Sequence, residues 1–220
     1  MNEYEKMVKG RLYNAMSKDL IKPHLQGLDG CMKFNNIPYK KAKKRERLLN
    51  KLIPSTTGKN LGVFSPLYFE YGKNIIIGSE CFFNYNCVFL DIALITLGDS
   101  VWLGPNVTLA TPMHPLLASE RTNKEYPDGY HDLEYAKPIT ICDNVWIASS
   151  VTICGGVTIG KDSVVCAGSV VTTDMPSGYL IGGVPAKPIR KLTEDDKIDV
   201  CNTYLKEELP LSLRDKKAKD

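Results

Sequence analysis

The chain has 220 residues, of which 43% are hydrophobic and 24% are charged, and its formal net charge at pH 7 is only +3. No apolar run approaches the ~18 residues of a membrane span, and the charged start MNEYEKMVKGR lacks the apolar segment of a signal peptide. We therefore expect a cytoplasmic protein with no membrane partner and no obligatory nucleic-acid partner.

The first 55 residues predict a small helical domain. EYEKMVKGRLYNAM is typical of a short helix, and YKKAKKRERLLNKLI of a second one that is bounded by Pro38 and Pro54. The basic run KKAKKRER resembles a nucleic-acid-binding segment, but no aromatic stacking pattern accompanies it. An exposed helix face explains the same charges.

A period of six organises residues 56–190. In the stretch 139–176 every sixth residue is aliphatic, namely Ile141, Ile147, Ile153, Ile159, Val165 and Val171. The same spacing recurs earlier, at Leu97, Leu103 and Leu109, and more loosely at Ile77, Phe83 and Phe89. A helix repeats near 3.6 and a half-buried strand repeats at 2, so neither explains the pattern. Three six-residue units can instead close one triangular coil of a parallel β-helix.

One long segment interrupts this repeat. Residues 112–137 have the polar, turn-rich sequence PMHPLLASERTNKEYPDGYHDLEYAK. A segment of this length inside a compact domain is usually functional or disordered, and we interpret it as an excursion loop that leaves the solenoid. After the last repeat, residues 191–220 predict a short C-terminal helix, with Thr193 as its N-cap, and a tail.

The cysteines are odd in number and none forms a CxxC pair, so we expect small, reduced, apolar side chains and neither disulfides nor zinc ligands. They are Cys31, Cys81, Cys87, Cys142, Cys154, Cys166 and Cys201.

Several segments carry a family resemblance. They are NYNCVFLD, GPNVTLATPMHP, LEYAKPITICDNVWIASS, GVTIGKDSVVCAGSVVT and GGVPAKPIRKL, together with YEKMVKGRLYNAM and CMKFNN near the N-terminus. In combination they resemble the maltose and galactoside O-acetyltransferases of the hexapeptide acyltransferase superfamily. The resemblance implies a mainly β fold, a left-handed parallel β-helix with a small helical N-terminal domain and a short C-terminal helix. It also implies a homotrimer with active sites between subunits, and acetyl-CoA as co-substrate.

His114 is the predicted general base for the acceptor hydroxyl. It lies where the excursion leaves the solenoid, imidazole titrates near neutrality, and the catalytic histidine of the family falls on this His-Pro pair. Glu134, at the return end of the excursion, is expected to orient His114, although a solvated loop acid is an equal alternative. His24 and His131 are interpreted as incidental.

The resemblance also implies the groups that stabilise the oxyanion and bind the acceptor. Asn84 is placed as an amide donor to the oxyanion, with a turn residue as the alternative, and the backbone N–H of Ser149 as the second donor. Acceptor-binding residues map to Glu70, Asp91 and Asn14. Asp19 is a later acid in the same N-terminal stretch as Asn14.

For coenzyme A, the resemblance implies a pantetheine arm along the solenoid backbone and phosphates near its end. The corresponding residues are Ala148, Ser149, Ala167, Thr172, Thr173, Lys187 and Arg190. Trp146 is a candidate wall of the cleft, and no metal ligand set is expected.

The sequence therefore predicts an acetyl-CoA-dependent O-acetyltransferase that acts on a hydroxyl of a maltose-, glucose- or galactoside-like sugar. One alternative is the same reaction on a non-sugar acceptor, such as a xenobiotic alcohol or amine, and another is a non-catalytic structural solenoid. A γ-class carbonic anhydrase is disfavoured because it needs three histidines per zinc, and the only three histidines of this chain are widely scattered.

Overall fold

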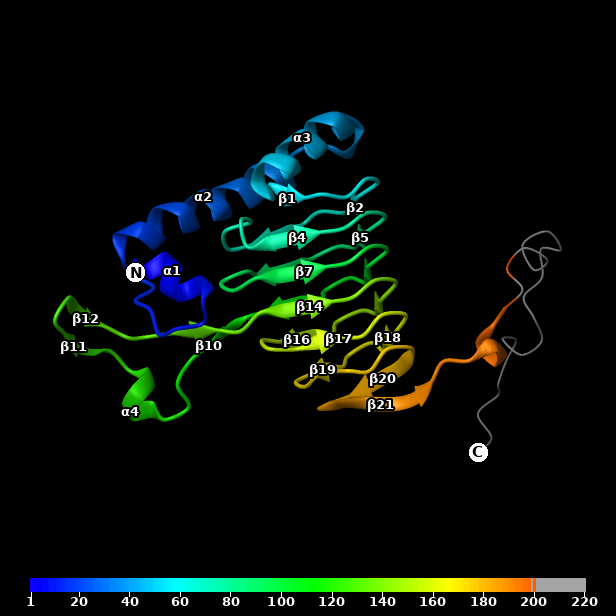
Figure 1. Ribbon diagram of the computed structural model, residues 1–220. Coiled ribbons are helices and arrows are strands. Elements are labelled where there is room, and N and C mark those ends of the chain that lie inside the picture. Colours follow the sequence, from blue (N-terminus) through cyan, green and yellow to red (C-terminus); the bar gives the residue numbers. More distant parts are fainter. Residues whose placement is uncertain (199, 201–220) are drawn as a thin grey trace.

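Each coil of the chain contributes one short strand to each of three parallel sheets, and successive coils stack along one axis (Figure 1). This computed structural model describes residues 1–198 and residue 200. The result is a left-handed parallel β-helix, which confirms the predicted fold. Within the described residues, no helix has both the length and the apolar character needed to cross a membrane.

The three sheets are the faces of the solenoid. The first face contains β1 (Ser55–Thr56), β4 (Ile75–Ile77), β7 (Ile95–Leu97), β14 (Ile139–Ile141) and β17 (Thr158–Ile159). The second face contains β2 (Gly62–Val63), β5 (Phe82–Phe83), β8 (Trp102–Leu103), β15 (Trp146–Ile147), β18 (Val164–Val165), β20 (Tyr179–Gly183) and β21 (Ala186–Lys191). The third face contains β3 (Leu67–Phe69), β6 (Cys87–Leu90), β9 (Thr108–Ala110), β16 (Thr152–Cys154) and β19 (Val170–Val171).

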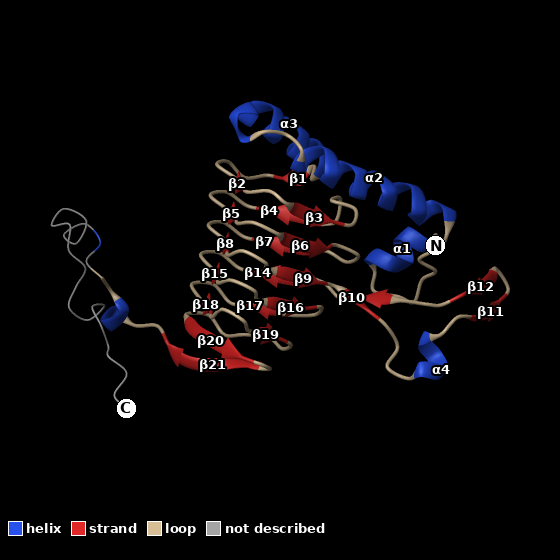
Figure 2. Ribbon diagram, turned by 180° about the vertical axis from the view of Figure 1, so that it is seen from behind, coloured by secondary structure: helices blue, strands red, loops and turns tan. Residues whose placement is uncertain are grey.

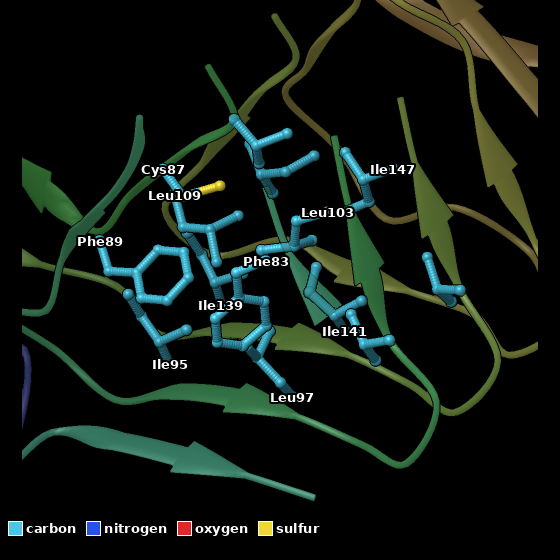
Figure 3. Close-up of a cluster of buried hydrophobic side chains, with 14 of the residues drawn as sticks. Phe83, Cys87, Phe89, Ile95, Leu97, Leu103, Leu109, Ile139, Ile141 and Ile147 are labelled. Atoms are coloured by element: carbon cyan, nitrogen blue, oxygen red, sulfur yellow. The ribbon is translucent and has the colours of Figure 1, made fainter. Parts of the chain in front are cut away.

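The residues of the six-residue period point into the coils. All twelve of them are at most 1% exposed, and those of neighbouring coils pair in register, as Leu97 does with Ile141 and Ile141 with Ile159. Figure 3 shows this core as continuous layers of aliphatic and aromatic side chains contributed by all three faces. Burial of these layers is the main force that holds the coils together.

Coil length changes along the axis. Phe69 pairs with Phe89, and Phe89 with Leu109, so these coils repeat after 20 residues, whereas the later pairs Ile141–Ile159 and Ile153–Val171 repeat after 18. The additional residues fall at the corner between the third and first faces, where the excursion also leaves. The step of eight residues from Phe89 to Leu97, where the period of six breaks, is thus the sequence signal of a widened corner.

The other corners use residues that tolerate a left-handed backbone. Asn86, Asn106 and Asn144 have φ values of 60°, 61° and 58°. This conformation is costly for most side chains but is accessible to asparagine. The corner amides also bond from coil to coil, because Nδ2 of Asn86 donates to Oδ1 of Asn106 at 2.9 Å.

Helices cover the first coil of the solenoid, namely α2 (Lys18–Asn35), η1 (Tyr39–Lys41) and α3 (Ala42–Leu52). The first helix, α1 (Glu3–Val8), lies beside the coils and contacts α2 and β13. The predicted helix in YKKAKKRERLLNKLI is confirmed by α3. The first predicted helix is shorter than expected, since it ends at Val8 and the chain turns at Gly10, whose φ is 67°.

The longest helix, α2, was not predicted. Pro23, Gly27 and Gly30 lie within it and are poor helix formers, so the local pattern indicated no helix. The structure shows why the glycines are there. A Cβ atom at Gly27 would collide with the carbonyl group of Glu70, and one at Gly30 would collide with the side chain of Leu52. The glycines therefore let α2 pack closely against the solenoid and α3.

The excursion is folded and not structureless. β10 (Pro112–Met113) pairs with β13 (Tyr135–Ala136) in antiparallel fashion at its base, and Lys137 N–H donates to Thr111 O at 3.0 Å. Beyond this neck lie α4 (Ala118–Arg121) and a hairpin of β11 (Lys124–Tyr126) and β12 (Gly129–His131). Figure 2 shows the excursion and α1 on the same side of the solenoid, opposite the column of second-face strands.

At its other end the solenoid closes with an antiparallel pair, β20 and β21. A short 3₁₀ helix, η2 (Glu194–Asp196), follows Thr193, whose N–H donates to the Asp196 carboxylate at 2.9 Å. The predicted start after Thr193 is therefore confirmed. The rest of the predicted C-terminal helix lies outside the described residues.

The six cysteines that the structure describes are all unpaired, as predicted. Burial raises the pKa of Cys31 and of Cys87 to about 11, which makes these thiols unreactive fillers of the core. Cys201 lies outside the described residues.

Candidate active site

His114 lies immediately after β10, at the neck of the excursion. Its imidazole is 46% exposed, so a substrate can reach it. His114, Asp132 and Glu134 each bring one nitrogen or oxygen atom within 4.8 Å of the others. We call the edge between the third and first faces, with these three residues, the histidine corner.

The side chains of His114, Asp132 and Glu134 could also ligate a divalent cation, so a chelator control belongs in every assay of this site.

Glu134 is fixed by the N-terminal segment. The Tyr13 hydroxyl donates to Oε2 of Glu134 at 2.9 Å, and the two residues exchange backbone hydrogen bonds of 2.9 and 3.1 Å. Burial and the nearby Glu134 carboxylate raise the pKa of Tyr13, so its hydroxyl remains a donor at neutral pH. Sequence reasoning placed Glu134 near His114 but missed Tyr13, which comes from the far end of the chain.

Asp132 is the second acid of the histidine corner and was also missed. Its Oδ2 atom is 4.0 Å from Nδ1 of His114. A signal existed, because Asp132 and Glu134 are two residues apart, and alternate residues of an extended chain point to the same side.

Asn84 lies at a different corner, between the second and third faces, directly after β5. Its Oδ1 atom accepts the N–H of Tyr85 at 2.8 Å, which orients the side chain. Within the described residues, the Nδ2 group of Asn84 donates no hydrogen bond. The side chain is therefore anchored through its oxygen and keeps its donor free.

Ser149 lies at the same corner, two coils further along the axis. It is the second residue after β15, which ends at Ile147. Its backbone N–H makes no hydrogen bond to any described residue. Gly104 occupies the coil between Asn84 and Ser149, and a Cβ atom there would come within 2.8 Å of Ser149 N. The glycine thus keeps this N–H accessible. We call the edge with Asn84, Gly104 and Ser149 the amide corner.

A cavity of about 560 Å³ lies beside the amide corner, and Asn84 and Gly104 line it. Trp102 and Trp146 form its apolar wall; they pair across β8 and β15 and are 56% and 51% exposed. Trp146, a candidate wall residue from the sequence, therefore points outward into the cavity.

The two corners lie on opposite edges of the third face. Asn84 precedes β6 and Asp91 follows it, so one four-residue strand separates the two edges, a span of roughly 13 Å. One chain does not bring His114 and Asn84 together. A site that uses both needs the histidine corner of one chain and the amide corner of another.

Of the predicted acceptor residues, Glu70 and Asn14 lie near the histidine corner but are already engaged. The Glu70 carboxylate pairs with Nε2 of His24 on α2. Asn14 is 9% exposed; its Oδ1 accepts the N–H of Met16 at 2.9 Å, and its Nδ2 donates to Asp128 at 3.4 Å. Asp19 accepts the N–H of Glu3 at 3.1 Å.

The structure contradicts the predicted acceptor-binding role of Asp91. Its side chain is 0% exposed, and its oxygens accept the backbone N–H groups of Glu70 and Tyr71 at 2.9 Å and of Asn74 at 3.3 Å. Through these hydrogen bonds, Asp91 stabilises the widened corner between the third and first faces from the interior of the solenoid. Burial raises its pKa from 3.8 to about 7, although the three N–H donors act in the opposite direction.

We expect Asp91→Asn to flatten the pH dependence of stability. Native Asp91 retains a proton that the unfolded chain releases above pH ~4, so the wild type should lose stability as the pH rises from about 4 to about 7. Urea unfolding at pH 5 and pH 8 measures the loss, with the exposed Asp195→Asn as control. If the free energy of unfolding falls equally in the wild type and in Asp91→Asn between pH 5 and pH 8, the buried carboxylate is ionised over that whole range.

The predicted coenzyme residues divide between the two corners. Ala148, Ser149 and Ala167 stack at the amide corner, whereas the exposed Thr172 and Thr173 follow β19 at the other edge of the third face. The third face separates the two sets on one chain.

Lys187 and Arg190 lie on β21 at the end of the solenoid. Arg190 makes a double ion pair with Asp196, at 2.8 and 2.5 Å. This pairing lowers the pKa of Asp196 to about 2. Within the described residues Lys187 has no ion-pair partner, so it is the more available cation of the two.

The solenoid of six-residue repeats, its helical cover and its long excursion, together with two family models, place the chain among the hexapeptide-repeat acetyltransferases. The family model of the maltose acetyltransferase hexapeptide capping motif matches residues 6–58, and that of the bacterial transferase hexapeptide matches residues 138–173.

Relatives support the same assignment over most of the chain. Galactoside O-acetyltransferase of Escherichia coli is 39% identical over 88% of this chain and 91% of its own length. The crystal structure of a maltose O-acetyltransferase from Clostridium difficile has a TM-score of 0.81, with 39% identity over 88% of this chain and 99% of that one. A hexapeptide-repeat acetyltransferase of Vibrio cholerae, complexed with acetyl coenzyme A, has a TM-score of 0.78, with 37% identity over 88% and 100% of the chains.

The chain belongs to the maltose and galactoside O-acetyltransferase family of hexapeptide-repeat acetyltransferases. It is an acetyl-CoA-dependent O-acetyltransferase, and acetyl-CoA is its co-substrate.

Proposed function

We propose that the protein transfers acetyl from acetyl-CoA to a hydroxyl of a maltose-, glucose- or galactoside-like sugar, with His114 as general base. The observation that carries this proposal is the exposed imidazole of His114 beside two carboxylates at the neck of the excursion. The similarity to a galactoside and a maltose O-acetyltransferase supports the sugar acceptor. We propose the cytoplasm as its location, because acetyl-CoA is made and used there.

In the proposed reaction, His114 takes the proton of the acceptor hydroxyl as the oxygen attacks the thioester carbonyl. The tetrahedral oxyanion accepts hydrogen bonds from the Asn84 amide and the Ser149 N–H, both of which are free donors at the amide corner. Collapse of the intermediate breaks the C–S bond, and the coenzyme thiolate takes the proton from His114.

We propose a homotrimer in which each site lies between two chains. The separation of the histidine and amide corners on one solenoid supports this arrangement. In a closed ring, the histidine corner of each chain can face the amide corner of the next, and three identical interfaces complete three sites.

Thiol release from acetyl-CoA tests the proposed function directly. The purified protein is assayed with maltose, glucose, a β-galactoside, a chloramphenicol-like alcohol and an amino sugar, each with and without chelator. We expect turnover with at least one of the neutral sugars. Turnover with the alcohol or the amino sugar alone would instead favour the non-sugar alternative, and binding of acetyl-CoA without turnover would place the acceptor outside this panel. A failure to bind acetyl-CoA would favour a structural solenoid.

Lys187→Ala should raise the KM for acetyl-CoA about three- to tenfold and leave kcat nearly unchanged, because a free ammonium group would contact the coenzyme phosphates. Arg190→Ala should act in the same direction but more weakly, since Asp196 already neutralises the guanidinium. Steady-state kinetics with varied acetyl-CoA measures both effects, and Lys59→Ala at the far end of the solenoid is the control. An unchanged KM for Lys187→Ala would exclude it from the nucleotide site.

A further inference from the structure

The Asp132 carboxylate is available to His114 in a way that Glu134 is not. Glu134 already accepts a hydrogen bond from Tyr13 through Oε2. Within the described residues the Asp132 carboxylate accepts none, and its Oδ2 atom is 4.0 Å from Nδ1 of His114. Its side chain is 26% exposed, so a small rotation can turn this contact into a hydrogen bond.

His131 holds the backbone of Asp132 in place. Nδ1 of His131 is 2.7 Å from the carbonyl oxygen of Asp132, and Nε2 is 3.0 Å from Oδ1 of Asp128. Both partners are hydrogen-bond acceptors, so the ring bridges the backbone carbonyl of Asp132 and the carboxylate of Asp128. The ring is 6% exposed and stacks on Tyr126 at 4.7 Å. His131 is therefore a fixed part of the hairpin that carries Asp132.

The same network reaches the N-terminal segment. Asp128, which accepts from His131, also accepts a hydrogen bond from Nδ2 of Asn14 at 3.4 Å. Asn14 directly follows Tyr13, which holds Glu134. The hairpin, the N-terminal segment and the two carboxylates at His114 thus form one connected unit.

We propose that Asp132 is a positioning residue for His114 and that His131 holds the backbone of Asp132 beside His114. This inference rests on the proposed function, since it takes His114 as the general base. Asp132 would accept the Nδ1 proton of His114, which fixes the tautomer whose Nε2 can take a proton from the acceptor. Nothing in the sequence pattern assigned a role to Asp132, His131 or Asp128.

The test compares single and double variants in the thiol-release assay, with the neutral sugar that the wild type acetylates fastest. Asp132→Asn should lower kcat about 10- to 100-fold and leave the KM for acetyl-CoA unchanged. Asp132→Glu, which restores the charge, should recover most of the rate. Glu125→Gln, which removes an exposed acid from the same hairpin, is the matched control and should match the wild type.

His131→Gln should lower kcat about tenfold, because Asp132 would lose the ring that holds its backbone carbonyl. Because His131 acts through Asp132, the double variant His131→Gln with Asp132→Asn should be no slower than Asp132→Asn alone. Tyr130→Phe, an exposed change on the same strand, is the control for the hairpin. Binding of acetyl-CoA and thermal melting confirm that each variant has folded.

Three results would overturn the inference. One is an Asp132→Asn variant with wild-type kcat. Another is a double variant whose loss is the product of the two single losses, because His131 would then act independently of Asp132. The third is a wild-type activity that a chelator removes and a divalent metal restores, because the three side chains would then be metal ligands. If His114→Ala retains wild-type activity, the proposed function fails; if only Asp132→Asn does, this inference alone fails.

Discussion

His114→Ala should lower kcat by roughly 10² to 10⁴ while the affinity for acetyl-CoA stays within about twofold of wild type. The loss is large because, among the described residues of the histidine corner, no other side chain carries an exposed imidazole that can accept the hydroxyl proton. Binding is spared because the predicted coenzyme residues do not include His114. Thiol release with a sugar acceptor gives kcat, and titration calorimetry gives the acetyl-CoA affinity.

A second substitution at this position separates chemistry from shape. His114→Gln keeps a polar side chain of similar size but cannot act as a base near neutral pH. We expect it to be as slow as His114→Ala. If the glutamine variant keeps most of the activity, His114 binds the acceptor and does not accept its proton.

Mixed trimers should recover activity from two inactive variants. Asn84→Ala removes one oxyanion donor and should cost about 10² to 10³ in kcat. When it is coexpressed with His114→Ala under a second affinity tag, every mixed trimer has one interface where an intact His114 meets an intact Asn84. Random assembly of a closed ring then gives about a quarter of the wild-type activity.

The expected recovery depends on the separation of the two corners across the third face. Coexpression of His114→Ala with His114→Gln is the matched control, because no combination of those chains restores the base. If the mixed His114 and Asn84 trimers are as inactive as this control, each site is built within a single chain and the interface proposal is wrong.

The solenoid was predictable because the spacing of its aliphatic residues indicates by itself which side chains are buried. Ile141, Ile147 and Ile153 follow one another at the fixed spacing of the coil, and no contact with a distant element is needed to place them inward. The helix α2 was not predictable for the opposite reason. Gly27 and Gly30 lower its helix propensity, and their benefit appears only when Glu70 and Leu52 are seen to press against them.

The residues of the candidate site also differ in whether the local sequence or a distant contact places them. His114 was predicted as the base because it adjoins the point where the repeat stops and because the family's catalytic histidine falls on this His-Pro pair. Asp132 was not predicted as a site residue, because its position beside His114 depends on a hairpin that the contacts of His131 with Asp128 and Asp132 stabilise. Asp91 was assigned to the acceptor because a carboxylate in a sequence carries no sign of burial; the structure shows it bonded to three backbone N–H groups.

The helical cover and the β20–β21 pair have a consequence for solubility. A stack of parallel coils is open at both ends, and the unpaired strand edges of its first and last coils would recruit the coils of another molecule. Figure 1 shows α2 and α3 over the first coil and β20–β21 across the last. The two covers terminate growth along the axis. A chain that lost residues 1–54 would expose β1, β2 and β3 and gain a template for end-to-end polymerisation into fibres.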